Sequence, residues 1–583
     1  MIRHALLPRS GAELLADQLL VHGVEIAFGV PGESYLALLD ALAERSERVR
    51  FIVCRHEGGA AFMAESYAKL TGRPGVCLVT RGPGACNAAI GVHTAHQDSS
   101  PLVLLVGQVG TDLLEREAFQ EIDYRRMFGP MAKWVAQIDR VERVPEFISR
   151  AFQTATSGRP GPVVLALPED MLAASAAVPD ALPYQPVVPR PAPEAIEATL
   201  DALAAAERPF VLVGGFGWSR EAARALREVA EALELPVGCA FRFQDIFDNA
   251  HPNYAGDVGL GVNPALAARI READWVLVLG ARLGEATTSG YTLFAVPRPR
   301  QRLIHVHPDP EELGRVYQAE RYICSGVSPF ALALARALAA RPRRVRSEGR
   351  EQRRAWMREL AAWRAEPPIY RDRAEPARLN LWQVMQTIER VAPADAILTN
   401  GAGNFATWAH RFFRYRGIEH CGKSQLAPSS GAMGYGLPAA LMAALVAPER
   451  LTIHLAGDGD FLMTAQELAT AQHYGAAFVS LVFNNGMYGT IRMHQERAHP
   501  GRVYGTALTN PDFAAFAQSF GVWGARATST AQFEAAFVEA LSVVRRERRC
   551  ALIELVVDPE DLTPGQSLSA IRAQALAERG EAA

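Results

Sequence analysis

A short apolar run that ends in glycines and acids constrains the fold of this chain more than any other feature. Residues 451–456 (LTIHLA) are apolar and partly β-branched, which is typical of a buried parallel strand. Gly457, Asp458, Gly459 and Asp460 follow at once, and residues 461–474 then place apolar side chains at helical spacing with no internal glycine or proline. The pattern predicts a strand, a glycine turn and a helix, which together form the repeating unit of a parallel α/β sheet.

The same alternation recurs along the 583 residues, a length too great for one hydrophobic core. Strand-like runs that end in glycine turns, with helix-like segments between them, fill three regions of the chain. We therefore predict an α/β protein with three doubly wound parallel-sheet domains, at residues 1–175, 197–340 and 379–562. The remaining segments are predicted to be an Ala- and Pro-rich linker (176–196), an Arg-rich irregular linker (341–378) and a tail (563–583).

A second strand-like run, residues 478–483, ends at Asn484 and Asn485. Asn485 follows Asp458 by 27 residues, enough for one helix and one strand, so both side chains are expected at the carboxyl edge of one sheet. Backbone N–H groups beside the glycines would attract an anion, which Asp458 would repel unless a cation stood between them. Carboxylate and amide oxygens suit a hard ion such as Mg²⁺, so we predict a diphosphate and metal site. The alternative is a plain turn between strand and helix.

Composition excludes several classes of function. The net charge is −3 with both signs interspersed, which does not favour a nucleic-acid partner. No apolar run is long enough to span a bilayer or to act as a signal peptide, so no membrane partner is expected. The seven cysteines are scattered and form no CxxC pair, which predicts reduced thiols in a cytoplasmic protein.

The glycine and asparagine motifs together resemble the binding motif of enzymes that use thiamine diphosphate (ThDP, also called thiamine pyrophosphate). Met487, Tyr488 and Gly489 continue the likeness after Asn485. The resemblance implies that the Asp458 carboxylate, the Asn485 side chain and the Met487 main-chain carbonyl bind Mg²⁺. It also implies that the cofactor contacts the main chain of Asp460 together with Gly457, Gly459, Tyr488 and Gly489.

A second group of residues makes the likeness more specific. Residues 55–61 (RHEGGAA) resemble a motif of the acetohydroxyacid synthase (acetolactate synthase) branch of the ThDP enzymes. By that resemblance Glu57 activates the cofactor; the alternative is an acid that only satisfies a helix N-terminus. Residues 430–438 (SGAMGYGLP) resemble a further segment of the branch, in which Met433 would wedge beneath the cofactor and Gly431 would face its amino group. Met433 could instead simply fill a gap in the core.

The resemblance covers nearly the whole chain and extends to the substrate region. It implies that Gly32, Phe119 and Gln120 lie near the substrate, although the last two could instead form a helix turn packed against the sheet. The chain departs from biosynthetic acetolactate synthases at Glu33, which puts an acid near the substrate mouth, and at Arg81, which replaces a small residue. Residues 286–290 (ATTSG) also replace the segment that follows GAR in FAD-binding synthases, so FAD is possible but open.

These observations predict a ThDP- and Mg²⁺-dependent enzyme that decarboxylates a 2-oxo acid such as pyruvate and transfers the acyl group to a second carbonyl. The alternatives are a simple 2-oxo acid decarboxylase, a glyoxylate-carboligase-like enzyme, a diketone-cleaving enzyme, or a ThDP-fold regulatory subunit without activity. The resemblance implies small 2-oxo acid or aldehyde substrates. It also implies a homodimer or homotetramer in which Glu57 and the diphosphate motif of one active site come from different subunits.

Overall fold

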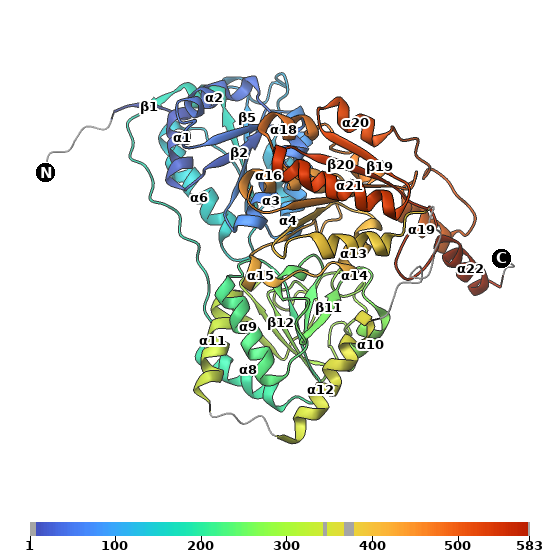
Figure 1. Cartoon of the computed structure of the whole chain (residues 1–583). Helices are drawn as coiled ribbons and strands as arrows, with labels where there is room; N and C mark the ends of the chain where they lie inside the picture. Colours follow the sequence, from blue (N-terminus) through green and yellow to red (C-terminus); the bar gives the residue numbers. More distant parts are fainter. Residues whose placement is uncertain (1–6, 342–346, 366–377, 581–583) are drawn as a thin grey trace. The chain divides into compact units, whose positions relative to one another are not determined.

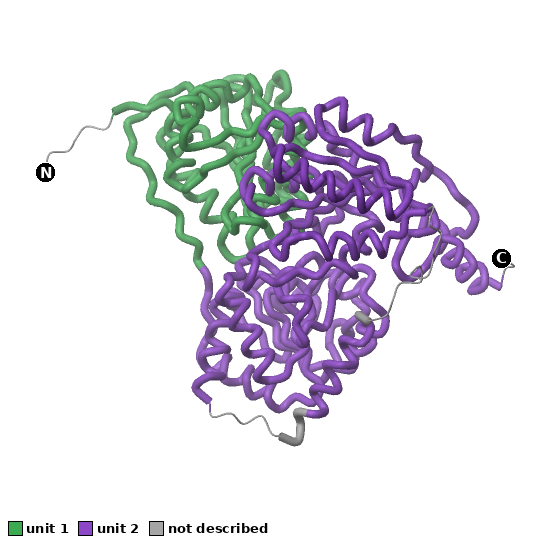
Figure 2. Tube along the Cα trace, viewed as in Figure 1, with its two compact units in different colours: residues 1–187 green, residues 188–583 purple. Residues whose placement is uncertain are grey.

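A computed structural model describes residues 7–341, 347–365 and 378–580. The chain divides into two compact units, Met1–Val187 and Val188–Ala583, which are coloured separately in Figure 2. The first unit contains one six-stranded parallel sheet, and the second contains two. The predicted domain limits within this arrangement stay predictions.

The sheet of the first unit has its strands in the order β3-β2-β4-β5-β7-β6, all parallel (Figure 1). Their bounds are β2 (Ile26–Gly29), β3 (Arg50–Val53), β4 (Gly75–Val79), β5 (Leu102–Gln108), β6 (Trp134–Gln137) and β7 (Pro162–Pro168). One face is covered by α1 (Gly11–Val21), α2 (Leu36–Ala43) and α6 (Val144–Thr156), and the other by α3 (Glu57–Thr71) and α4 (Pro83–Asp98). The strand order reverses between β2 and β4, where a doubly wound sheet opens a ligand crevice.

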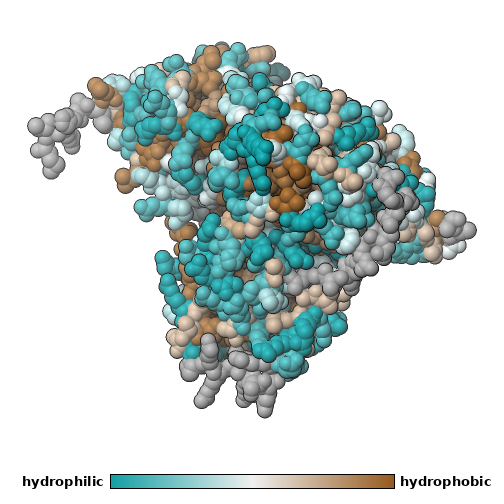
Figure 3. All heavy atoms as spheres, in the orientation of Figure 1, coloured by the Kyte–Doolittle hydropathy of each residue, from teal (hydrophilic) through white to brown (hydrophobic). Residues whose placement is uncertain are grey.

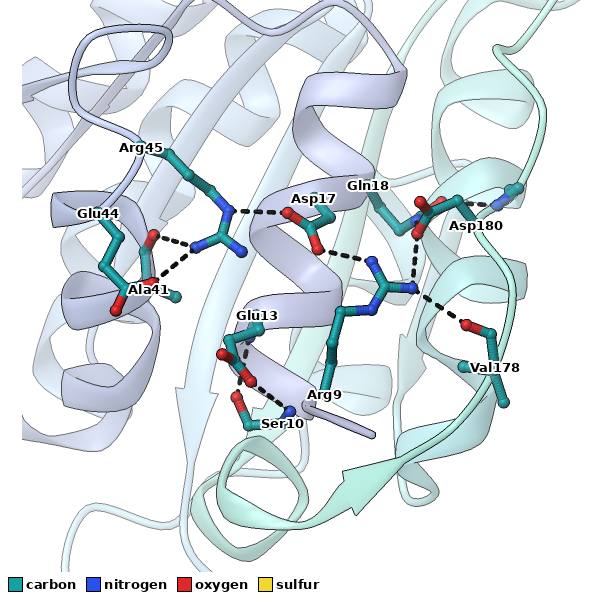
Figure 4. A network of polar contacts seen from close by, with 11 residues as sticks. Arg9, Ser10, Glu13, Asp17, Gln18, Ala41, Glu44, Arg45, Val178 and Asp180 are labelled. Carbon is teal, nitrogen blue, oxygen red and sulfur yellow. Dashed lines mark hydrogen bonds and ion pairs between the residues drawn. The ribbon is translucent and has the colours of Figure 1, made fainter. Parts of the chain in front are cut away.

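A polar network fixes the start of the first unit (Figure 4). Ser10 caps α1 reciprocally with Glu13, so that two backbone N–H groups at the helix start are satisfied. Asp17 on this helix accepts from Arg9 at 2.6 Å and from Arg45 at 2.8 Å. β1 (Arg9–Ser10) also pairs with β8 (Ser175–Ala176), so the beginning and the end of this unit are held together.

The second sheet has the order β11-β10-β9-β12-β13-β14, again all parallel. Its strands are β9 (Pro209–Val213), β10 (Val237–Ala240), β11 (Tyr254–Val258), β12 (Trp275–Leu279), β13 (Arg302–His307) and β14 (Arg321–Cys324). Apolar clusters fill both faces, one beneath α8 (Pro193–Ala205), α9 (Arg220–Leu233) and α11 (Val327–Ala340), the other beneath α10 (Pro264–Arg271) and α12 (Ser347–Ala361).

Helix α12 corrects the prediction of an irregular linker at residues 341–378. Trp356, Leu360 and Trp363 are buried in the core of the second sheet, and their spacing of four and three residues forms an apolar stripe despite the many arginines around it. Arg353 of the same helix is itself buried and donates to carbonyls at the ends of α8 and α9, including those of Leu203 and Leu233. Residues 342–346 and 366–377 of the predicted linker lie outside the described residues. Of the other predicted linker, residues 177–192 run without helix or strand, whereas residue 176 ends β8 and residues 193–196 begin α8.

The third sheet has the order β16-β15-β17-β18-β20-β19. Its parallel strands are β15 (Ile397–Asn400), β16 (Gln425–Leu426), β17 (Thr452–Gly457), β18 (Val479–Asn484), β19 (Trp523–Ala527) and β20 (Ala551–Val556). One face packs on α13 (Leu381–Val391), α14 (Phe405–Phe412) and α21 (Thr530–Ser542), the other on α16 (Gly436–Val446), α18 (Glu467–Tyr474) and α20 (Phe513–Ser519). The strand order reverses between β15 and β17.

The single helix predicted over residues 461–474 is wrong in its extent. A short helix, α17 (Asp458–Phe461), comes directly after β17, and a turn separates it from α18. Within that turn the Thr464 hydroxyl donates to the Gly434 carbonyl at 2.7 Å, a tertiary contact that competes with a continuous helix.

The fold class is as predicted, with three six-stranded parallel sheets flanked by helices. Hydrophilic residues dominate the face shown in Figure 3, with smaller apolar areas between them. Across the described ranges, every helix is too short or too polar to cross a membrane.

Candidate cofactor site

A cavity of about 240 Å³ lies at the carboxyl edge of the third sheet, where the strand order reverses. Loops that follow β15, β17 and β18 line it, the position at which open parallel sheets bind ligands. Every cofactor residue predicted in this part of the chain lines the cavity: Gly431, Met433, Gly457, Asp458, Gly459, Asp460, Asn485, Met487, Tyr488 and Gly489.

Asp458 occupies the first position after β17 and is only 3% exposed. One carboxylate oxygen accepts from the Gly486 amide at 2.9 Å and from the Asn510 side chain at 2.8 Å, and the other accepts from the Gly459 amide at 2.9 Å. Burial raises the pKa of this carboxyl above its usual value, and the hydrogen bonds oppose the rise. Among the described residues, no lysine or arginine forms an ion pair with Asp458. A divalent cation bound here would supply the positive charge that the buried carboxylate needs.

Asn485 and Met487 follow β18 on a tight turn, in which Gly486 has a φ of +68°. The Asn485 amide oxygen accepts from the Met487 backbone N–H at 3.2 Å. The described residues contain no group of three or more His, Cys, Asp and Glu side chains that could hold a metal. A metal here would therefore need the amide and carbonyl oxygens beside Asp458, a donor set that suits Mg²⁺.

Asp460 is buried, and its carboxylate connects neighbouring loops. One oxygen accepts from the Ala402 amide at 3.1 Å and from the Gly434 amide at 2.9 Å. The other oxygen is buried without a hydrogen-bond partner in the described structure, and burial raises the pKa of Asp460 to about 7. The carboxylate thus holds the loop after β15 and the turn that carries Met433. The prediction that the Asp460 main chain serves the diphosphate is not tested by these contacts.

The first unit places Glu57 at the first position of α3, beyond the carboxyl end of β3. The Asn87 side chain on α4 donates to Glu57 Oε2 at 2.9 Å. A Cβ at Gly84 would lie 3.3 Å from Oε1, so the glycine keeps that oxygen open. His56 caps the helix by accepting from the Gly58 amide at 3.0 Å, and Glu57 lies in the first turn, so the alternative of an acid that satisfies the helix N-terminus is not tested here.

Gly32, Phe119 and Gln120 lie on loops at the same edge of the first sheet. A Cβ at Gly32 would lie 2.4 Å from the Thr80 Cβ, so only glycine fits there. Phe119 is 73% exposed and belongs to a turn. Gln120 has a φ of +66°, and its backbone approaches Gly82 closely.

Sequence reasoning missed several residues that shape the cavity. Asn510 bonds both Asp458 and Asn484, at 2.8 and 2.9 Å. Its signal was the run Asn-Pro-Asp-Phe at residues 510–513, in which Asp512 caps α20. Asn510 thus acts through Asp458, whereas the residues that line the cavity itself and were missed come from segments without a motif: Asn404, Phe405, Trp408, Asp561 and Leu562.

Comparison with known proteins places these three sheets in one family. Residues 9–127 match the N-terminal TPP binding domain of the thiamine pyrophosphate enzymes, residues 196–334 match their central domain, and residues 401–555 match their C-terminal TPP binding domain. The chain belongs to the thiamine pyrophosphate enzyme family.

Its relatives place it in the acetolactate synthase-like branch of the ThDP enzymes. It is 34% identical to the acetolactate synthase large subunit of Parasynechococcus marenigrum, over 89% of this chain and 83% of that protein. It is 32% identical to the acetolactate synthase isozyme 2 large subunit of Escherichia coli, with 90% and 92% covered. A probable acetolactate synthase large subunit of Methanocaldococcus jannaschii is also 32% identical, with 95% and 93% covered.

Proposed function

We propose that this ThDP enzyme is a carboligase that decarboxylates a 2-oxo acid such as pyruvate and transfers the acyl group to a second carbonyl carbon. The cavity on the third sheet carries the proposal, because predicted cofactor residues from three separate segments of the sequence converge on it around the buried carboxylates of Asp458 and Asp460. When bound there, ThDP supplies the electron sink that decarboxylation of a 2-oxo acid needs.

We propose that different residues around the cavity bind Mg²⁺, the diphosphate and the rings of ThDP. Asp458, the Asn485 side chain and the Met487 carbonyl would bind the metal, whose charge offsets the burial of the carboxylate. Gly457, Gly459 and the main chain of Asp460 would contact the diphosphate, together with Tyr488 and Gly489. Gly431 and Met433 would contact the rings, on a turn that Asp460 holds through Gly434.

Glu57 would serve as the acid–base group for the cofactor. Its Oε2 accepts from Asn87, which orients the carboxyl group, and its Oε1 stays open beside Gly84. A carboxyl held in this way can share a proton with a ring nitrogen of the cofactor through Oε1. Gly32, Phe119 and Gln120 would border the substrate.

Further parts of the proposal concern assembly and other cofactors. We propose that two copies of the chain contribute to each active site in a cytoplasmic homodimer or homotetramer, which sedimentation of the purified protein would test. Several relatives are named large subunits, so the same experiment should also look for a second, smaller protein that sediments with this chain. Binding of FAD stays open, as in the prediction, because the departure at residues 286–290 does not decide it.

Product analysis tests the function directly. The purified protein is supplied with ThDP, Mg²⁺ and pyruvate, with and without an added aldehyde, and products are identified by mass spectrometry. We expect CO₂ and a product with a new carbon–carbon bond, either acetolactate or a hydroxyketone. Release of acetaldehyde without any such product would contradict a carboligase and favour a simple decarboxylase. Mass spectrometry of the cofactors released from the purified protein would show whether FAD is bound.

A further inference from the structure

The carboxyl edge of the first sheet carries an arginine with two carboxylates. The strand order reverses between β2 and β4, so the loops that follow these strands border the point where such sheets bind ligands. Glu33 lies in the loop after β2, and Arg81 lies in the loop after β4. Glu169 begins α7 (Glu169–Ala173), directly after β7 at the same edge.

Arg81 bonds three separate segments. Its guanidinium donates to Glu33 Oε1 at 2.9 Å, to Glu169 Oε1, and from Nε to the Phe119 carbonyl at 3.3 Å. The Arg81 side chain is 9% exposed, whereas the side chains of Glu33 and Glu169 are 65% and 46% exposed. Arg81 is therefore buried, whereas the carboxylates of Glu33 and Glu169 are exposed to solvent.

The surroundings hold this cluster in one arrangement. Gly82 has a φ of +59°, and a Cβ there would lie 2.8 Å from the Gln120 carbonyl oxygen. The Gly82 amide donates to the Tyr124 hydroxyl at 3.1 Å, and the Ser34 and Thr80 hydroxyls are 2.9 Å apart. Arg81 is thus a positioning residue, because its loop is fixed on both sides and each of its three guanidinium nitrogens donates a hydrogen bond within the cluster.

We propose that Glu33 and Glu169, held by Arg81, make an uncharged carbonyl the preferred acceptor of this enzyme. The cluster has one positive and two negative charges, a net charge of −1. An acceptor that carries a carboxylate meets like charge, and the guanidinium that could offset this charge is enclosed and already paired with two carboxylates, whereas an aldehyde meets no such penalty. The inference rests on the proposed carboligase function and narrows its acceptor.

The donor carboxylate meets the same charge when it binds, but this cost is common to every acceptor and cancels when two acceptors are compared. The donor then loses its carboxylate as CO₂ when the bond between that carbon and the keto carbon breaks. The electron pair left behind forms the new bond to the acceptor carbonyl carbon, and the acceptor oxygen takes one proton. A 2-oxo acid anion, an aldehyde and a proton thus give a hydroxyketone and CO₂, whereas a 2-oxo acid acceptor would keep its negative charge beside the cluster throughout.

A series of charge changes tests the inference. Propanal and 2-oxobutanoate are compared as acceptors for labelled pyruvate, since the two differ by one carboxylate, and the ratio of their kcat/KM values is measured. The wild type is expected to prefer propanal. Glu33→Gln and Glu169→Gln should each move the ratio toward 2-oxobutanoate by about fivefold, and the double variant should move it further, because each step removes one negative charge.

Glu25→Gln is the matched control. Glu25 is also exposed and paired with an arginine, Arg73, but it precedes β2 and so lies at the opposite edge of the same sheet. The ratio should not change in this variant. An unchanged ratio in Glu33→Gln, an equal shift in the control, or a wild type that prefers 2-oxobutanoate would overturn the inference.

Release of CO₂ from pyruvate without acceptor separates the two levels of the proposal. If CO₂ is released but the ratio of kcat/KM values is the same in the wild type, Glu33→Gln and Glu169→Gln, this inference alone is overturned. A wild type that releases no CO₂ from any 2-oxo acid would overturn the proposed function and this inference with it.

Discussion

The C-terminal helix α22 (Leu568–Glu578) offers the sharpest quantitative prediction. It packs on α19 (Gly489–Ala498), the helix that follows the predicted metal turn, through an apolar cluster. Arg572 of α22 donates to both oxygens of Glu496 on α19, at 2.6 and 2.8 Å. Arg492 and the Gly501 amide donate to the same carboxylate, which is 1% exposed.

The magnitude follows from the pKa of Glu496. Hydrogen bonding by Arg572 is the largest cause that lowers this pKa, from 4.5 to about 2. A shift of that size corresponds to roughly 3 kcal/mol in favour of the ionised form. Because Arg492 and Gly501 remain in Arg572→Met, we expect the variant to lose about 2 kcal/mol of the stability of α22.

Hydrogen exchange measured by mass spectrometry reports this loss directly. At pH 7 the amides of α22 should exchange roughly thirtyfold faster in Arg572→Met than in the wild type. Arg390→Met is the control, since Arg390 and Glu534 form an exposed pair worth less than about 1 kcal/mol. The folded pKa of Glu496 lies below its unfolded value, so its stabilisation is present above pH 4.5 and is lost as the pH falls through 2. Equal exchange at pH 7, or a difference that persists near pH 2, would refute the reasoning.

Three further predictions concern other parts of the molecule. Glu57→Gln should reduce CO₂ release from pyruvate by about 100-fold or more while ThDP still binds, and unchanged turnover would contradict the role of Glu57. Lys69→Met should cost about 3–5 kcal/mol in urea unfolding, because it removes the ammonium group that pairs with the buried side chains of Glu65 and Asp98; a cost as small as that of Arg73→Met would argue against this. Trp356→Ala should cost about 3–5 kcal/mol, and a loss below about 1 kcal/mol would show that α12 is not part of the core.

The glycine turns and the residues after them were predictable because strand ends in a parallel sheet converge on one edge. Asp458 and Asn485 are 27 residues apart in sequence, yet they line one cavity because β17 and β18 are neighbours. Strand ends did not predict Gly431 and Met433, which came only from the resemblance of residues 430–438 to a segment of the family. The fold class followed from the repeated alternation of strand and helix patterns.

The sequence patterns did not predict contacts between residues that are far apart in the sequence. The abundance of arginine hid the apolar stripe of Trp356 and Leu360, and one of those arginines, Arg353, proved to be buried. The Asp460 carboxylate binds amides at residues 402 and 434, which no local pattern relates to it. In the same way, Arg81 stood out as a departure, but its pairing with Glu33 and Glu169 needed the folded loops.

Binding of ThDP tests the central claim most directly. Calorimetric titration of the wild type should show binding that requires Mg²⁺. Asp458→Ala should abolish that binding, whereas Asp201→Ala, which removes an exposed acid of the same unit, should bind as the wild type does. Equal ThDP affinity in Asp458→Ala and the wild type would contradict the assignment of this cavity to the cofactor and its metal. The same holds if the wild type binds ThDP equally well with and without Mg²⁺.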